Sequence, residues 1–131
     1  MAAGLRLECI RGDYAVWRLP ADAPLPPEPE SGELFSVSRT AEEVSVICGA
    51  DGAPDHARVE GPFAALRVEG TLDFGLTGIL ASLTAPLAEA GVSVFAISTY
   101  DTDYLLIARE RLGEAIAALT AAGHEIVGSD S

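Results

Sequence analysis

Residues 92–108 read Val92-Ser-Val-Phe-Ala-Ile-Ser-Thr-Tyr-Asp-Thr-Asp-Tyr-Leu-Leu-Ile-Ala108. Strand-forming residues fill both ends of this stretch, and Ser, Thr and Asp fill residues 98–103 between them, which predicts a β-hairpin with a polar turn. The first strand, residues 92–97, is apolar on both faces, because Val94 and Phe95 would point in opposite directions. Such a strand needs cover on both faces or a neighbour beyond its own domain. We therefore interpret the hairpin as one wall of a ligand site and as an assembly surface.

The segments on either side of the hairpin predict a split βαβ unit. Residues 64–69 alternate as a strand, residues 78–90 and 112–122 have apolar residues at helical spacing, and residues 124–127 form a short last strand. The order strand, helix, strand, strand, helix, strand is the ferredoxin-like arrangement. It places residues 92–97 at a sheet edge, where an apolar strand favours aggregation unless another strand pairs with it. We expect pairing with the first half of the chain or with a second copy.

The first helix of this unit contains Pro86, which has no N–H, so the Ser82 carbonyl loses its usual helical donor. Gly91 and Gly123 follow the two helices as C-terminal caps. We interpret His124, at the start of the last strand, as structural, and His56, beside Asp55, as a solvated loop residue.

The first half of the chain contains strands and no good helix. Residues 5–10 and 14–19 read as a hairpin around Gly12-Asp13, and residues 34–38 and 43–48 read as two more strands. Residues 20–32 hold five of the eight prolines and form an irregular connection.

An internal repeat relates the two halves. Offset by 60 residues, residues 35–47 lie on residues 95–107, with Phe, Ser, acidic and apolar positions coinciding, although chance similarity of two hairpins is the alternative. The sequence therefore predicts an α+β fold of two ferredoxin-like domains whose antiparallel sheets pair edge to edge. Residues 1–60 would form a degenerate first domain and residues 61–131 a complete second one.

The composition limits the classes of partner that we expect this protein to bind. The chain has 131 residues, a formal charge of -12, eight arginines and no lysine, which argues against nucleic-acid binding. Cys9 and Cys48 are too few for a zinc site and are expected to be small buried residues, although a disulfide is possible in an exported protein. The sequence shows no signal peptide and no apolar run of membrane-spanning length. We expect a cytoplasmic protein that does not contact a membrane.

The sequence contains no catalytic or cofactor-binding motif, so we expect a protein without enzymatic activity, cofactor or metal. Asp101 and Asp103 are paired carboxylates, but no base or nucleophile accompanies them.

Two segments suggest a ligand site. The loop at residues 73–79 opens the first helix, whose N-terminal N–H groups suit a carboxylate, and Gly75 and Gly78 allow close approach to the backbone. Asp103, in the hairpin turn, could hold an ammonium group. Together they match the two charges of an amino acid. The alternative is that Gly78 serves only helix–sheet packing and Asp103 only the turn.

Residues 78–107 closely resemble the ACT domains of the CASTOR-type family, in particular the Ile-Ser-Thr-Tyr-x-x-Asp turn that ends at Asp103 and the Pro-Leu-Ala of the helix. Residues 35–38 and 41–46 resemble the first, degenerate ACT copy of that family. The resemblance implies tandem ACT domains, amino-acid sensing and no catalysis by the module. It also implies that five residues of this sequence contact the ligand: Gly78, Ile79, Thr99, Tyr100 and Asp103.

One position departs from the arginine-sensing member of that family. An acidic residue associated with the ligand's guanidinium corresponds here to Leu76, which cannot pair with a cation. A smaller or apolar amino acid is therefore the better expectation.

The leading hypothesis is a homodimeric regulatory protein that binds an amino acid at ACT–ACT interfaces and acts on a regulated protein partner. The alternative hypothesis is a ligand-free interaction module that uses its apolar edge to recruit a protein. A small enzyme is the third and least supported hypothesis.

Overall fold

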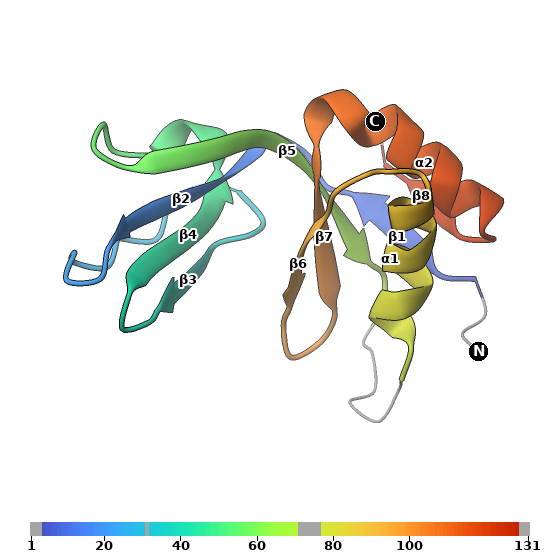
Figure 1. Ribbon diagram of the computed structural model, residues 1–131, viewed down its shortest axis with the longest axis horizontal. Helices are drawn as coiled ribbons and strands as arrows, with labels where there is room; N and C mark the ends of the chain where they lie inside the picture. Colours follow the sequence, from blue (N-terminus) through green and yellow to red (C-terminus); the bar gives the residue numbers. More distant parts are fainter. Residues whose placement is uncertain (1–3, 31, 71–76, 129–131) are drawn as a thin grey trace.

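The computed structural model describes residues 4–30, 32–70 and 77–128 (Figure 1). Within these ranges the chain forms strands, two α-helices and two short 3-10 helices, in two parts that meet at one long strand. In chain order these elements are β1 (Arg6–Cys9), β2 (Tyr14–Pro20), β3 (Ser36–Arg39), β4 (Glu43–Gly49), η1 (Ala50–Gly52), β5 (Arg58–Val68), α1 (Ile79–Glu89), β6 (Phe95–Ser98), β7 (Asp103–Ala108), η2 (Arg109–Arg111), α2 (Leu112–Ala121) and β8 (Glu125–Val127).

The α+β architecture and the predicted order of the C-terminal half are confirmed. β5, α1, β6, β7, α2 and β8 follow one another as strand, helix, strand, strand, helix, strand. The two helices cover one face of this part of the sheet (Figure 1). The predicted helical stripes are confirmed as well, because Leu83 and Leu87 of α1 and Leu112 and Leu119 of α2 are buried.

Strand β1 does not pair with β2, so the predicted N-terminal hairpin is wrong. β1 lies between β5 and β8, antiparallel to the first and parallel to the second. β2 pairs with the first part of β5 instead, while β1 pairs with its last residues. The physical reason is the length of β5, whose 11 residues accommodate both strands along one edge.

The first half forms an antiparallel arrangement in the order β3, β4, β2, and its described residues contain no α-helix. It joins the C-terminal sheet edge to edge through the pairing of β2 with β5. The predicted edge strand forms no strand pairing across this junction, because β6 pairs only with β7 among the described residues, although its Ile97 packs against the core between the halves. Pairing of β6 with a second copy remains a prediction, and so does the division at residue 60; β1, from the first half, lies in the sheet of the second.

The two faces of β7 contribute to two different cores. Leu105 and Ile107 pack against the helices, whereas Leu106 faces the other way and packs against Tyr14 and Ile47 of the first half. All five side chains are buried. Each Leu or Ile buried in this way stabilises the fold by about 1.5–3 kcal/mol relative to exposure. The strand is therefore apolar on both faces because both faces are covered.

His124 joins three segments of the C-terminal half. Its Nδ1 accepts a hydrogen bond from the Leu5 N–H at 3.0 Å, so its Nε2 carries the ring proton and donates to the Ser82 carbonyl at 3.0 Å. Ser82 is the residue whose carbonyl Pro86 leaves without a helical donor. The predicted structural role of His124 is therefore confirmed, and the histidine replaces the missing helical donor.

Candidate functional site

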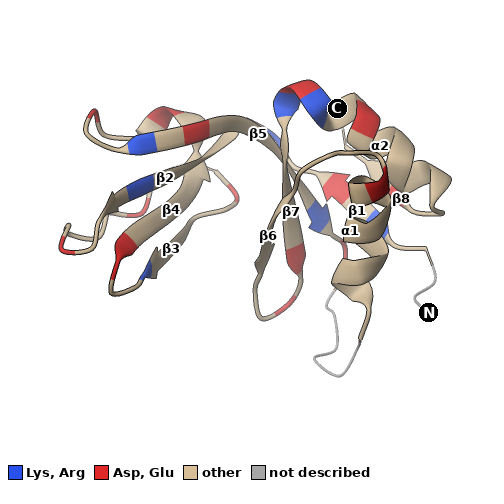
Figure 2. Ribbon diagram, viewed as in Figure 1, with Lys and Arg blue, Asp and Glu red and all other residues tan. Residues whose placement is uncertain are grey.

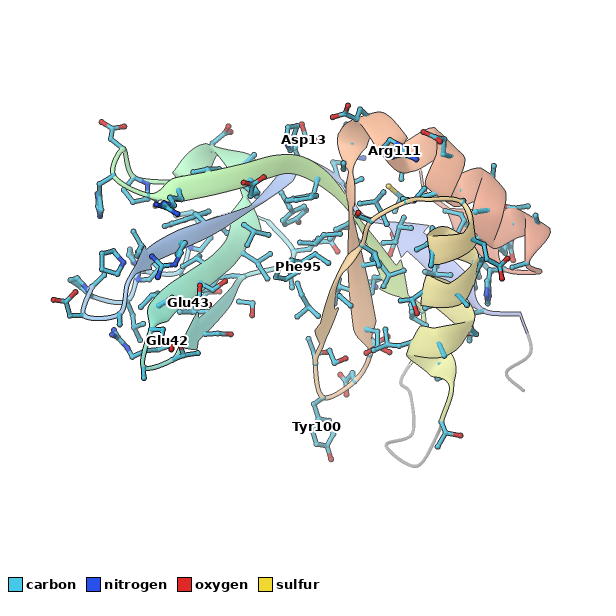
Figure 3. The ribbon with its side chains drawn as sticks, in the orientation of Figure 1. Asp13, Glu42, Glu43, Phe95, Tyr100 and Arg111 are labelled. Atoms are coloured by element: carbon cyan, nitrogen blue, oxygen red, sulfur yellow. The ribbon has the colours of Figure 1, made fainter. Side chains whose placement is uncertain are left out.

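The turn between β6 and β7 is held by hydrogen bonds between its two threonines. The Thr99 N–H donates to the Thr102 carbonyl at 2.8 Å, and the Thr102 N–H donates to Thr99 Oγ1 at 3.3 Å. The Thr102 hydroxyl is buried and donates to the Val68 carbonyl at 2.6 Å, which ties the turn to the end of β5. Tyr100 lies at the tip of the turn with 80% of its surface exposed, and Figure 3 shows it pointing away from the sheet.

Asp103 is a buried carboxylate on the helix-covered face of the sheet. It faces Ser98 across the hairpin, and the Ser98 hydroxyl donates to Asp103 Oδ1 at 2.6 Å. Its side chain lies on the same side of β7 as Leu105, two residues along, which packs against the helices. A buried carboxylate next to a helix is suited to an ammonium group or to a hydrogen-bond donor.

Gly78 and Ile79 form the start of α1. Gly78 has a φ of +80°, a conformation that favours glycine, and no side chain caps the first N–H groups of the helix. A Cβ at Gly78 would meet no atom of the described residues within 4 Å. Figure 1 shows the start of α1 and the β6–β7 turn at the same end of the C-terminal half. The loop residues Asp73, Gly75 and Leu76, which the sequence also singled out, lie outside the described residues.

A pocket of about 460 Å³ lies beside this turn. Of the five predicted ligand contacts only Thr99 lines it; its residues are Arg67, Val68, Glu69, Gly70, Thr99, Asp101, Thr102 and Tyr104. The guanidinium of Arg67 is already engaged, by Glu8 and by Glu33, whose Oε2 lies 3.5 Å from Arg67 Nη1. The predicted combination of Gly78, Ile79, Thr99, Tyr100 and Asp103 as one ligand site therefore remains a prediction.

A larger pocket, of about 650 Å³, opens beside the turn between β1 and β2. Sequence reasoning missed it because its lining comes from three separate segments, none of which carries a recognisable motif. The one local signal was the pair Gly12-Asp13, which predicted a turn and nothing more.

Charges and possible metal ligands are dispersed in the described parts of the chain. Figure 2 shows arginines among acidic residues on both halves. Within residues 4–30, 32–70 and 77–128, no group of three or more His, Cys, Asp or Glu side chains is placed to hold a metal ion. Both cysteines are buried thiols, as expected, and no helix in these ranges has the length and apolar character needed to span a membrane.

Comparisons with known proteins identify related sequences. A family model described as an ACT domain matches residues 58–121, and a second model, of an N-terminal domain, matches residues 12–56. The human protein CASTOR3P is 31% identical over 93 residues, which cover 61% of this chain and 57% of that protein. The match thus spans little more than half of that relative.

Solved structures share the whole fold. Protein Atu0741 from Agobacterium tumefaciens has a TM-score of 0.89 and 31% identity, and the match covers 99% of this chain and 97% of that chain. The ligand-free regulatory subunit of aspartate kinase from Thermus thermophilus has a TM-score of 0.62 at 13% identity, with coverage of 92% and 97%. At that identity the second likeness shows a common fold.

Proposed function

Since the chain is an ACT-domain protein of the CASTOR type, we propose that it is a non-enzymatic regulatory protein that binds an amino acid. One observation carries the proposal: the buried carboxylate of Asp103 lies on the helix-covered face of β7, at the end of the molecule where α1 begins without a side-chain cap. The uncapped N–H groups suit the carboxylate of an amino acid, and Asp103 suits its ammonium group. Gly78, Ile79, Thr99 and Tyr100 complete the proposed contacts.

The ligand would regulate by binding one arrangement of the domains more tightly than another, and a protein partner would respond to the favoured arrangement. The two buried thiols fit the reducing conditions of the cytoplasm, where we expect the protein to act.

Replacing Asp103 with asparagine should weaken amino-acid binding at least about tenfold, because it removes a charge-assisted hydrogen bond. The measurement is a thermal-shift screen of the twenty amino acids, in which a ligand raises the melting temperature with concentration. Asp101→Asn is the matched control, since Asp101 is an exposed acid in the same turn. If Asp103→Asn left the ligand-induced rise in melting temperature unchanged, Asp103 would not belong to the site.

The same screen tests the alternative, a ligand-free module that recruits a protein through its apolar edge. The outer edge of β6, which pairs with no strand in the described parts of the chain, and the exposure of Phe95 support that alternative. None of the twenty amino acids would then change the melting temperature of the wild-type protein.

A homodimer is part of the proposal. β6 has an unpaired outer edge among the described residues, residues 92–98 carry no charge, and Phe95 is 41% exposed. Figure 3 places Phe95 on the side of β6 that faces the first half of the chain. An uncharged apolar edge favours pairing with another strand, here β6 of a second copy.

Phe95→Lys should shift the protein from dimer to monomer in sedimentation-velocity ultracentrifugation, because a charge opposes burial of this edge. Val59→Lys is the control, since Val59 is an exposed apolar residue on a different strand. A wild-type protein that sediments as a monomer at high micromolar concentration would contradict the dimer.

A further inference from the structure

The pocket beside the β1–β2 turn lies apart from the proposed amino-acid site and shares none of its residues. Three segments form its walls: the turn itself, the end of β4 with η1, and the Pro-rich connection. Its lining residues are Arg11–Tyr14, Cys48–Gly52, Pro29, Gly32 and Glu33. Its volume of about 650 Å³ is within the range of small-molecule sites.

The floor of the pocket is buried and uncharged. Tyr14 is 1% exposed, and its hydroxyl accepts a hydrogen bond from the Glu33 N–H at 3.0 Å, which holds the Pro-rich connection against the pocket. Burial raises the pKa of the Tyr14 phenol and that of the Cys48 thiol, the latter despite a lowering influence of the Trp17 indole. Both groups are therefore neutral at pH 7 and offer an apolar surface with a few hydrogen-bonding atoms.

Four charged residues line the pocket, and two of them, Arg11 and Asp51, have no ion-pair partner among the described residues. Asp13 is bound by Arg109, whose Nε donates to Asp13 Oδ1 at 2.8 Å, and Glu33 lies near Arg67. Arg11 and Asp51, by contrast, form no ion pair with any described residue. The pocket thus presents one uncompensated cation and one uncompensated anion.

The indole of Trp17 borders the same pocket. Trp17 is 4% exposed, and its buried indole N–H lies beside the Cys48 thiol, whose pKa it lowers, without a hydrogen bond of ordinary geometry in the described parts of the chain. A methyl group on Gly52, which lines the pocket, would lie 4.0 Å from Trp17 Cζ2 and 3.6 Å from Cys48 Sγ. The edge of the indole therefore lies next to the pocket wall, so a molecule bound in the pocket would change the surroundings of Trp17.

We propose that this pocket binds a small zwitterion of amino-acid or dipeptide size. Its carboxylate would pair with Arg11, its ammonium group with Asp51, and its body would cover Tyr14 and Cys48. A singly charged anion would be repelled by Asp51 and Glu33 in a chain whose formal charge is -12, and a singly charged cation would leave Arg11 unused. A zwitterion uses both free charges.

Trp17 is the only tryptophan of the chain, so its fluorescence reports on this pocket. We expect at least one of the twenty amino acids to change the emission saturably. Two derivatives of that amino acid serve as probes. The N-acetyl derivative lacks the positive charge of the ammonium group, and the amino-acid amide lacks the negative charge of the carboxylate. Both should bind at least tenfold more weakly.

Variants test the two anchors. Arg11→Gln and Asp51→Asn should each weaken the fluorescence-detected binding at least tenfold, while Arg58→Gln, an exposed arginine outside the pocket, should leave it unchanged. Arg11 and Asp51 are exposed, so both variants should retain the wild-type urea midpoint. Emission unaffected by all twenty amino acids, or binding retained in Arg11→Gln, would overturn the proposal.

The Asp103→Asn variant separates this pocket from the site of the proposed function. It should leave the Trp17 response intact even where it abolishes a thermal shift. A Trp17 response that is lost in Asp103→Asn and kept in Arg11→Gln would assign the signal to the other site and refute the pocket. An absent Trp17 response beside a thermal shift that needs Asp103 would refute the pocket alone.

Discussion

Replacing His124 with phenylalanine is expected to lower the free energy of unfolding by about 1–3 kcal/mol, the cost of leaving two part-buried backbone groups unsatisfied. Those groups are the Leu5 N–H and the Ser82 carbonyl, each 3.0 Å from a ring nitrogen of His124. Urea unfolding followed by circular dichroism measures the change. His56→Phe is the matched control; His56 is an exposed loop histidine, so a change within about 0.5 kcal/mol is expected there.

A double-mutant cycle with Pro86 tests the physical reason. Pro86→Ala restores an N–H to position 86 and with it a helical donor for the Ser82 carbonyl. His124→Phe should therefore cost less in the Pro86→Ala background, by an interaction free energy of about 0.5–3 kcal/mol. Additive effects would show that His124 does not act through the Ser82 carbonyl.

Tyr14→Ala is expected to destabilise the protein by about 3–5 kcal/mol, as other deletions of buried aromatic side chains do. Tyr14 is fully buried in the core that joins the two halves of the chain, where it packs with Leu106 and Ile47. Tyr14→Phe keeps the ring and loses only the hydrogen bond from the Glu33 N–H, so about 1 kcal/mol is expected. Tyr100→Ala, at an exposed tyrosine, is the control, and an equal effect of Tyr100→Ala and Tyr14→Ala would contradict the assignment.

Ionisation of Tyr14 is expected to lower the stability of the protein at alkaline pH. Burial raises the pKa of folded Tyr14 above its ordinary value of 10.0. Its stabilising contribution is complete below pH 10 and is lost as the pH rises through the folded pKa, because the unfolded state releases the proton first. The chain has no lysine to titrate in this range. Urea unfolding at increasing pH above 9 should show a smaller loss for Tyr14→Phe than for wild type.

The C-terminal half was predictable because its signals are local. Leu83 and Leu87 recur at helical spacing and both are buried, and Gly91, with a φ of +73°, follows α1 where a left-handed residue was expected. The pattern around residues 98–103 likewise predicted the β6–β7 turn. In each case the signal and the structure that it predicts lie within about ten residues.

Register was not predictable from the repeat. The offset of 60 residues places Val37 on Ile97, and both lie in antiparallel hairpins. Val37 pairs with Val46, whereas Ile97 pairs with Tyr104 and not with Leu106, the residue that the offset would indicate. The two turns are alike, since four residues separate Arg39 from Val44 and Ser98 from Asp103, and in each turn the N–H of a threonine donates to the carbonyl three residues later. The hairpins therefore correspond at an offset of 59 residues, and an error of one residue places every side chain on the opposite face.

The orphaned carbonyl of Ser82 was visible in the sequence, because Pro86 stands four residues later. Its partner was not, because His124 is distant in sequence and approaches only when α2 and β8 have packed. The candidate site shows the same limit. The residues of the β6–β7 turn and of the start of α1 could be named, but no local pattern states whether one pocket joins them.

The amino-acid sequence by itself determined the α+β class, the split βαβ order, both helical stripes and the polar turn that ends at Asp103, since each depends on neighbouring residues. Only the tertiary structure decided that β1 lies between β5 and β8, that the halves join through β5, and that Arg11, Asp51 and Tyr14 line one pocket. These features depend on which distant strands pair along the 11 residues of β5, and hydrophobic alternation, which is the same for every candidate partner, does not specify that choice.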